Sequence, residues 1–69
     1  MRVTINGEVE TIDEADLSIS RLLAIKQVES PDMVSVQVNG KIIARQAYDH
    51  QLVVADDEIE FLYFMGGGA

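Results

Sequence analysis

The sequence contains no cysteine and is poor in histidine, proline and basic residues, with one His, one Pro and five Lys or Arg against twelve Asp or Glu. Without cysteine, the chain can form no disulfide, ligate no iron–sulfur cluster and perform no thiol catalysis of its own. A formal net charge of -7 makes the surface repel phosphate backbones and anionic lipid head groups. We therefore expect neither nucleic acid nor a membrane as a partner.

The single histidine, the acidic cluster and the glycine run do not predict a catalytic, metal or phosphate site. His50 stands in a polar stretch without a second ligand spaced for a metal, so we interpret it as a surface residue. The acids at residues 56–58 precede a predicted strand and are typical of a solvated turn, in which Asp tolerates left-handed backbone. Residues 66–68 are no phosphate loop, because no helix follows them to supply amide donors.

A length of 69 residues allows one domain and no second core. Folding at this size buries only about 60% of the surface that the unfolded chain exposes, so a deep, dry active site would be costly and we do not expect an enzyme. With 48% hydrophobic residues, the chain has enough apolar material to fold without a metal or a disulfide. No run approaches about 18 apolar residues and residues 1–6 do not resemble a signal peptide, so we expect a cytoplasmic protein.

The first half of the chain predicts a β-hairpin followed by a helix. Polar and apolar residues alternate over residues 2–6 and 8–12, and Asn6-Gly7 between them suits a tight two-residue turn. Ser18 can cap a helix over residues 19–29, with Ile19, Leu22 and Leu23 on one face. We expect Ser30-Pro31 to end this helix, because proline disfavours helical geometry in the preceding residue.

The second half predicts three further strands. Residues 33–38 alternate, Asn39-Gly40 offers a second tight turn, and residues 41–44 return. The irregular stretch 45–55 reads as a loop with Tyr48 and Leu52 as anchors on the core. The last strand, residues 58–65, is apolar on both faces near its end, as expected of a central strand. The order predicts an α+β domain, residues 1–65, in which a mixed sheet packs on one main helix.

The glycine-rich end, residues 66–69, drops every large side chain directly after the predicted central strand. A glycine run can simply be a disordered end. Here it would leave the domain from a rigid base, and a glycine has no Cβ to block a nucleophile at its carbonyl carbon. We therefore expect a flexible tail that reaches into a narrow channel of a partner.

A set of segments along the chain has the order and spacing of one known family. These segments are Ile5-Asn6-Gly7-Glu8, Ser18-Ile19-Ser20-Arg21-Leu22-Leu23, residues 36–45, Tyr48, Asp57-Glu58-Ile59-Glu60 and the glycine end. Through them the whole chain resembles the ThiS-type sulfur carrier proteins of thiamine biosynthesis and their molybdopterin-synthase relatives, which have the ubiquitin-like β-grasp fold. One departure is Asp56, where the family usually has glycine; another is Ala69, because the mature family members end in Gly-Gly.

The resemblance implies a sulfur carrier that binds no cofactor and catalyses nothing itself. A ubiquitin-activating-type adenylyltransferase would use ATP to adenylate the terminal glycine, and a sulfur donor would replace AMP to leave a thiocarboxylate. The carboxyl of Gly68 would be the reactive group, with Gly67 before it and Gly66 extending the reach. The sulfur acceptor would be a thiazole synthase, and the free carrier a monomer.

Several alternatives stay open. The carrier could serve another pathway, such as molybdopterin or a sulfur amino acid, or the chain could be a β-grasp binding module with an inert tail. Ala69 would be removed by a peptidase, often a zinc metallopeptidase in this family, unless the activating enzyme tolerates it. Tyr63, Phe64 and Met65 are the candidate docking surface, although the same residues could belong to the core.

Overall fold

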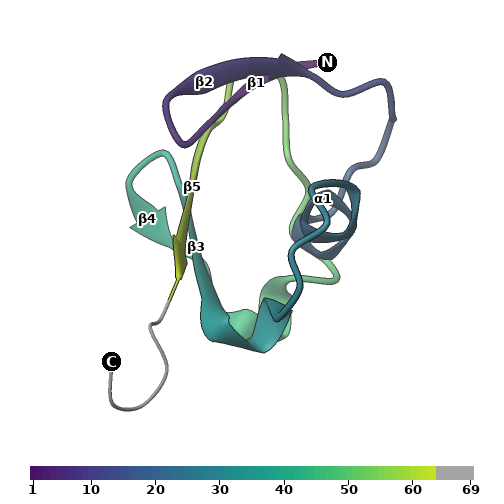
Figure 1. Cartoon of the computed structure of the whole chain (residues 1–69). Helices are drawn as coiled ribbons and strands as arrows, with labels where there is room; N and C mark the ends of the chain where they lie inside the picture. Colours follow the sequence, from purple (N-terminus) through teal and green to yellow (C-terminus); the bar gives the residue numbers. More distant parts are fainter. Residues whose placement is uncertain (64–69) are drawn as a thin grey trace.

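A mixed sheet of five strands forms the frame of the protein in the computed structural model, which describes residues 1–63 (Figure 1). β1 and β5 are parallel, whereas the other neighbouring pairs are antiparallel. With one α-helix on the sheet, this is the β-grasp arrangement, so the predicted α+β fold class is confirmed. The strands are β1 (Arg2–Ile5), β2 (Glu8–Thr11), β3 (Val34–Val38), β4 (Lys41–Ile42) and β5 (Glu58–Tyr63), in the spatial order β2-β1-β5-β3-β4.

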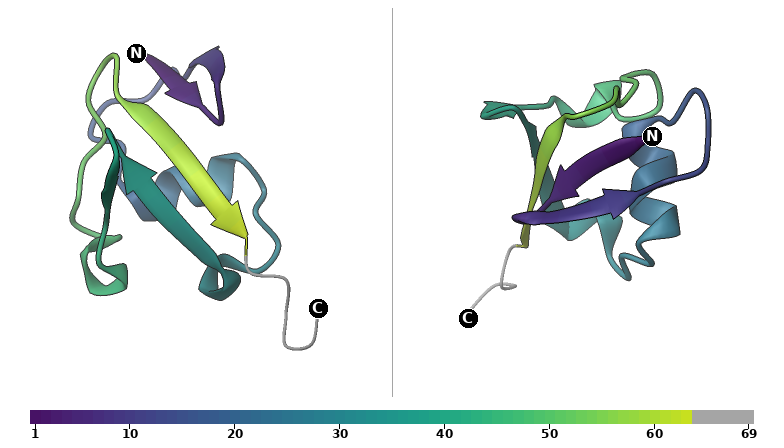
Figure 2. Two further views of the ribbon diagram at one scale, coloured as in Figure 1. Left: turned by 90° about the vertical axis from the view of Figure 1, so that its left-hand side faces the viewer. Right: turned by 90° about the horizontal axis from the view of Figure 1, so that it is seen from above.

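The helix α1 (Ile19–Ile25) lies across one face of the sheet, as the two views of Figure 2 show. Ile19, Leu22 and Leu23 are buried, as the periodicity predicts. The side chain of Ser18 accepts a hydrogen bond from the backbone N–H of Arg21 at 3.0 Å, so the predicted N-cap is also confirmed. The sheet and the helix thus enclose one core.

The predicted end of the helix is wrong. The helix stops at Ile25, Lys26 is its C-cap, and Gln27 adopts a left-handed φ of 57°. The backbone N–H of Val28 turns back to the carbonyl of Leu23 at 3.1 Å, which uses a carbonyl that the helix end leaves open. The helix therefore ends four residues before Glu29, its predicted last residue, and Pro31 instead begins the 3₁₀ turn η1 (Pro31–Met33).

The core lies between α1 and the inner face of the sheet. On β1, β3 and β5 every second side chain points inward, which confirms the alternation read from the sequence. The sequence does not predict that Leu17 and Val53 belong to the core, because both lie in stretches without regular alternation. The buried apolar residues are Val3, Ile5, Ile12, Leu17, Ile19, Leu22, Leu23, Val34, Val36, Val38, Tyr48, Val53, Ile59 and Phe61.

The strand expected over residues 41–44 is shorter than predicted, since β4 ends at Ile42. Beyond that point, two side chains cover the edge of β3: that of Arg45 in the 3₁₀ turn η2 (Arg45–Ala47) and that of Tyr48, which follows the turn. The hydroxyl of Tyr48 accepts a hydrogen bond from Val36 N–H at 3.0 Å, and Arg45 Nη2 donates to the carbonyl of Val34 at 2.9 Å. Side chains therefore satisfy backbone groups that a longer β4 would have paired.

Two predictions for the irregular stretch have opposite outcomes. Tyr48 is buried and anchors the loop, as predicted. Leu52 is 47% exposed, so its prediction as a core anchor is wrong. The backbone N–H of Val53 bonds to the carbonyl of Leu17 at 2.7 Å, and this contact carries the side chain of Val53 inward in place of its neighbour.

Candidate functional site

The predicted reactive end lies beyond the part of the chain that the structure describes. Residues 66–69, with Gly66, Gly67, Gly68 and Ala69, fall outside it, as do Phe64 and Met65 of the predicted docking surface. Tyr63 is described: it is the last residue of β5, and its side chain is 57% exposed. The described structure therefore defines the base from which the predicted site departs.

The base of the site is β5, the middle strand of the sheet. β1 pairs with it on one side through Thr4↔Glu58 and Ile5↔Ile59. β3 pairs with it on the other side over its full described length, from Val38↔Ile59 to Val34↔Tyr63. β5 therefore has strand partners on both edges at its start, whereas β3 alone pairs with it from Glu60 to Tyr63. The prediction of a central strand is confirmed.

Each Asn-Gly turn also holds β5 through its asparagine. Asn6 donates its backbone N–H to Ile59 carbonyl at 2.9 Å and accepts a hydrogen bond from Phe61 N–H on its side-chain oxygen at 2.9 Å. Asn39 repeats this arrangement on the other side: its N–H donates to Glu58 carbonyl at 2.7 Å, and its side-chain oxygen accepts from Glu58 N–H at 2.9 Å. Both asparagines have the positive φ that such turns require.

Asp57 corrects the interpretation of the acidic cluster as a solvated turn. Asp56 does adopt a left-handed φ of 70°, as that interpretation expected. Asp57, however, is buried, and its carboxylate accepts hydrogen bonds from Asn39 Nδ2 at 3.0 Å and from Val54 N–H at 2.9 Å. A buried carboxylate needs such donors, and here they join the loop before β5 to the turn after β3. Its role is structural.

The surface around the end of β5 exposes apolar side chains. Leu62 and Tyr63 are 42% and 57% exposed on the strand itself, and Met33 is exposed on η1 beside it. Because Val34 pairs with Tyr63, η1 lies next to the end of β5. The apolar character that the sequence predicts for this strand end is therefore in part solvent-facing and available for contact.

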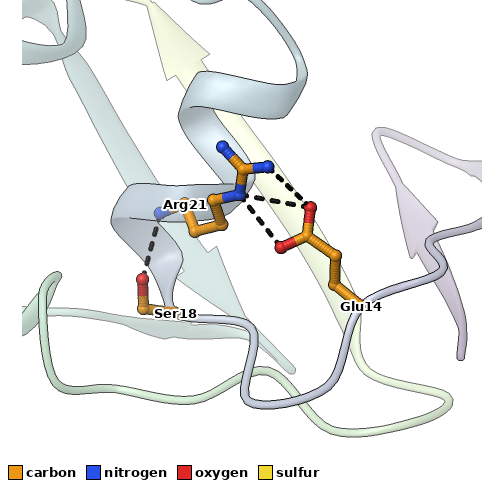
Figure 3. A network of polar contacts seen from close by, with 3 residues as sticks. All are labelled: Glu14, Ser18 and Arg21. Atoms are coloured by element: carbon orange, nitrogen blue, oxygen red, sulfur yellow. Dashed lines mark hydrogen bonds and ion pairs between the residues drawn. The ribbon is translucent and has the colours of Figure 1, made fainter.

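Polar contacts at the helix start fix the segment that leads into α1 (Figure 3). Arg21 donates from Nε and Nη2 to the carboxylate of Glu14, with the shortest contact at 2.8 Å. The hydrogen bonds from Arg21, helped by its positive charge, hold the pKa of Glu14 below its usual value of 4.5. The pair lies on the surface and supports the fold.

Within residues 1–63 the side chains do not assemble a metal centre, because no three His, Cys, Asp or Glu are grouped to hold an ion. His50 is exposed, as predicted. No helix among these residues has the length and hydrophobicity needed to span a bilayer.

Comparison with known proteins agrees with this architecture. A family model described as the ThiS family matches residues 3–68. The crystal structure of the thiamine biosynthesis protein ThiS from Geobacter metallireducens is 42% identical and superposes with a TM-score of 0.87, covering 99% of this chain and 100% of that one. The solution structure of a thiamine biosynthesis protein from the same organism is 41% identical, with a TM-score of 0.80 over 100% of this chain and 90% of that one.

A longer protein also matches. A thiazole synthase from Magnetococcus marinus is 32% identical over 68 residues, which are 99% of this chain and 20% of that protein. The chain therefore spans about a fifth of the length of this relative.

Proposed function

The chain belongs to the ThiS family, and on this premise we propose that it is a sulfur carrier for the thiazole of thiamine, with its C-terminal glycine as the attachment point. The observation that carries the proposal is the extent of the family match, which runs from residue 3 through the glycines to residue 68. The relatives named for thiamine biosynthesis and thiazole synthesis support the same pathway.

The proposed chemistry takes place on Gly68. A carboxylate is a poor electrophile, so a ubiquitin-activating-type adenylyltransferase first attaches it to the α-phosphorus of ATP and releases pyrophosphate. Hydrosulfide then attacks the carbonyl carbon and expels AMP. The product is a thiocarboxylate on Gly68. The carrier is a protein substrate in this cycle and performs no catalysis, and ATP is used by its partner.

The described structure supports this role by the way it holds β5. Two neighbouring strands and two asparagine side chains fix the strand from which the glycines depart. Gly66 and Gly67 have no side chains to obstruct a narrow channel leading to an enzyme's active site. We assign Tyr63, Phe64 and Met65 to the docking surface, a role supported by the exposure of Tyr63 and its neighbour Leu62.

Ala69 blocks the proposed reaction in the chain as encoded. The carboxyl of Gly68 is held in a peptide bond to Ala69, and adenylation needs it free. We assign its release to a peptidase of the zinc type, in which a metal-bound water attacks the Gly68–Ala69 amide at neutral pH.

The test compares the 69-residue chain with a chain that ends at Gly68. Each is incubated with ATP, sulfide and the adenylyltransferase of the same organism, and its intact mass is measured. We expect only the shorter chain to exchange one oxygen for sulfur, and only when ATP is present. Absence of sulfur in both chains would refute the carrier function. Sulfur on the longer chain with Ala69 retained would refute trimming alone.

A further inference from the structure

A groove lies where the end of α1, the turn η1 and the end of β5 come together. Its volume is about 520 Å³, and it is lined by Gln27, Val28, Glu29, Ser30, Met33 and Tyr63. Figure 2 shows the tip of β5 beside the turn that precedes β3, which is the region of the groove. The early end of the helix creates this groove, because Gln27 turns the chain out of α1 at its left-handed φ.

The walls of the groove are of two kinds. Val28 packs against the core and forms part of the floor, whereas Met33 and Tyr63 are 40% and 57% exposed and offer apolar surface to solvent. Glu29 places a carboxylate on the rim, and Asp32 in η1 adds a second acid nearby. The basic residues nearby have other partners: Lys26 pairs with Glu10, and Arg45 donates to the carbonyls of Pro31 and Val34.

We propose that this groove receives a loop of the thiazole synthase that presents an apolar side chain next to a lysine or arginine. The proposal deepens the proposed function and rests on it. Met33 and Tyr63 would pack against the apolar side chain, and the carboxylate of Glu29 would form an ion pair with the lysine or arginine. Partly apolar pockets with a charged rim are the usual form of such contacts.

The short stretch of chain between Tyr63 and Gly68 means that an enzyme acting on Gly68 must lie close to this groove. Gly68 is five residues beyond Tyr63, and a fully extended chain advances at most about 3.6 Å per residue, so Gly68 lies within about 18 Å of Tyr63. An enzyme that holds Gly68 in its active site must bring its surface against this end of the molecule. The groove opens beside Tyr63, at the origin of that reach.

Charge favours the same partner chemistry. The chain has a formal net charge of -7, and Glu29 has no lysine or arginine beside it among the groove-lining residues. A basic side chain from the partner would therefore find an uncompensated carboxylate at the rim. An acidic loop would be repelled, which gives the site selectivity as well as affinity.

The test measures the binding of the full chain to purified thiazole synthase of the same organism by calorimetry. We expect Met33→Asp to raise Kd by about tenfold or more and Met33→Leu to leave it nearly unchanged. Glu29→Lys should weaken binding and reduce its dependence on salt. The matched control is Val9→Asp on β2. Val9 is 63% exposed and pairs with Thr4, which pairs with Glu58 at the opposite end of β5 from Tyr63.

The results of these measurements distinguish a failure of the groove assignment from a failure of the proposed carrier function. Selective loss in Met33→Asp, with an unfolding midpoint equal to that of Met33→Leu, supports the proposal. If the wild type binds and Met33→Asp and Glu29→Lys bind equally well, the groove assignment is overturned. The same holds if Val9→Asp weakens binding as much as they do. In both cases the proposed carrier function still stands. Wild-type chain that becomes thiocarboxylated and yet does not bind thiazole synthase overturns both this acceptor and the groove assignment.

Discussion

The hydroxyl of Tyr48 satisfies a backbone N–H of β3 that a longer β4 would have paired. It accepts the hydrogen bond of Val36 N–H at 3.0 Å on the side of β3 that β4 is too short to cover. Tyr48→Phe would leave this buried donor without a partner. We expect a loss of about 1–3 kcal/mol in the free energy of unfolding, measured in urea.

The matched control for this change is Tyr63→Phe. Tyr63 is 57% exposed, and surface substitutions usually change stability by less than about 0.5 kcal/mol. Equal losses in the two variants would mean that the hydroxyl of Tyr48 is not an essential cap of the strand edge.

The two turn asparagines differ in what a carboxylate would do in their place. Asn39 donates from Nδ2 to buried Asp57, so Asn39→Asp removes the donor and brings a second negative charge against it. Loss of a hydrogen bond to a charged group costs about 1.5–3 kcal/mol, and the repulsion adds to this. The side chain of Asn6 instead accepts a hydrogen bond from Phe61 N–H, and an Asp oxygen can accept the same bond.

We therefore expect Asn39→Asp to lower the unfolding free energy by more than about 2 kcal/mol and Asn6→Asp by less than about 1 kcal/mol. Urea denaturation of both variants at neutral pH measures the difference. If the two losses are the same, the contact between Asn39 and Asp57 does not set the stability of this turn.

At the scale of an element, the start of α1 depends on Ser18 and on the pair formed by Glu14 and Arg21 (Figure 3). The pKa of Glu14 is lowered below 4.5 by the hydrogen bonds from Arg21. Because the folded-state pKa lies below that of the unfolded chain, the pair stabilises the fold above the unfolded-state value. This contribution is lost as the pH falls through the folded-state value.

Carbon-detected NMR titration of the Glu14 carboxyl should give a midpoint below 4.5, and Arg21→Gln should return it toward that value. Added salt should reduce the difference, since the pair is on the surface. A midpoint that does not respond to Arg21→Gln would show that another group lowers the pKa.

The sequence predicts the kinds of element better than their ends. Alternation identifies β1, β3 and β5, and the two Asn-Gly turns identify both hairpins, because these signals are local. The helix end is missed because Gln27 adopts a left-handed backbone without being glycine. The short β4 is missed because the side chains of Arg45 and Tyr48 replace its hydrogen bonds, a tertiary effect that local pattern does not carry.

The candidate site was predicted from the glycine end and from the resemblance to the ThiS family, and the family is confirmed. The roles of Gly66, Gly67, Gly68 and Ala69 stay predictions, since these residues lie outside the described part of the chain. The buried role of Asp57 could not be read from the sequence, because its partners Asn39 and Val54 come from different turns. The groove beside Tyr63 is likewise assembled from three segments.

At the scale of the whole molecule, the formal net charge of -7 predicts how the carrier meets its partners. An acidic protein approaching a basic surface is steered by long-range attraction, which salt screens with a Debye length of about 10 Å at 0.1 M and about 3 Å at 1 M. We expect the association rate constant with the activating enzyme to fall about tenfold or more between low salt and 1 M NaCl. The dissociation rate constant should change much less, because short contacts hold the complex once it has formed. Stopped-flow mixing over this salt range separates the two constants.

Glu8→Lys offers a matched probe: it reduces the net negative charge by two on an exposed residue of β2, far from the groove. It should slow association at low salt and have little effect at high salt. An association rate independent of salt would mean that apolar contact, and not the charge of the molecule, controls the encounter.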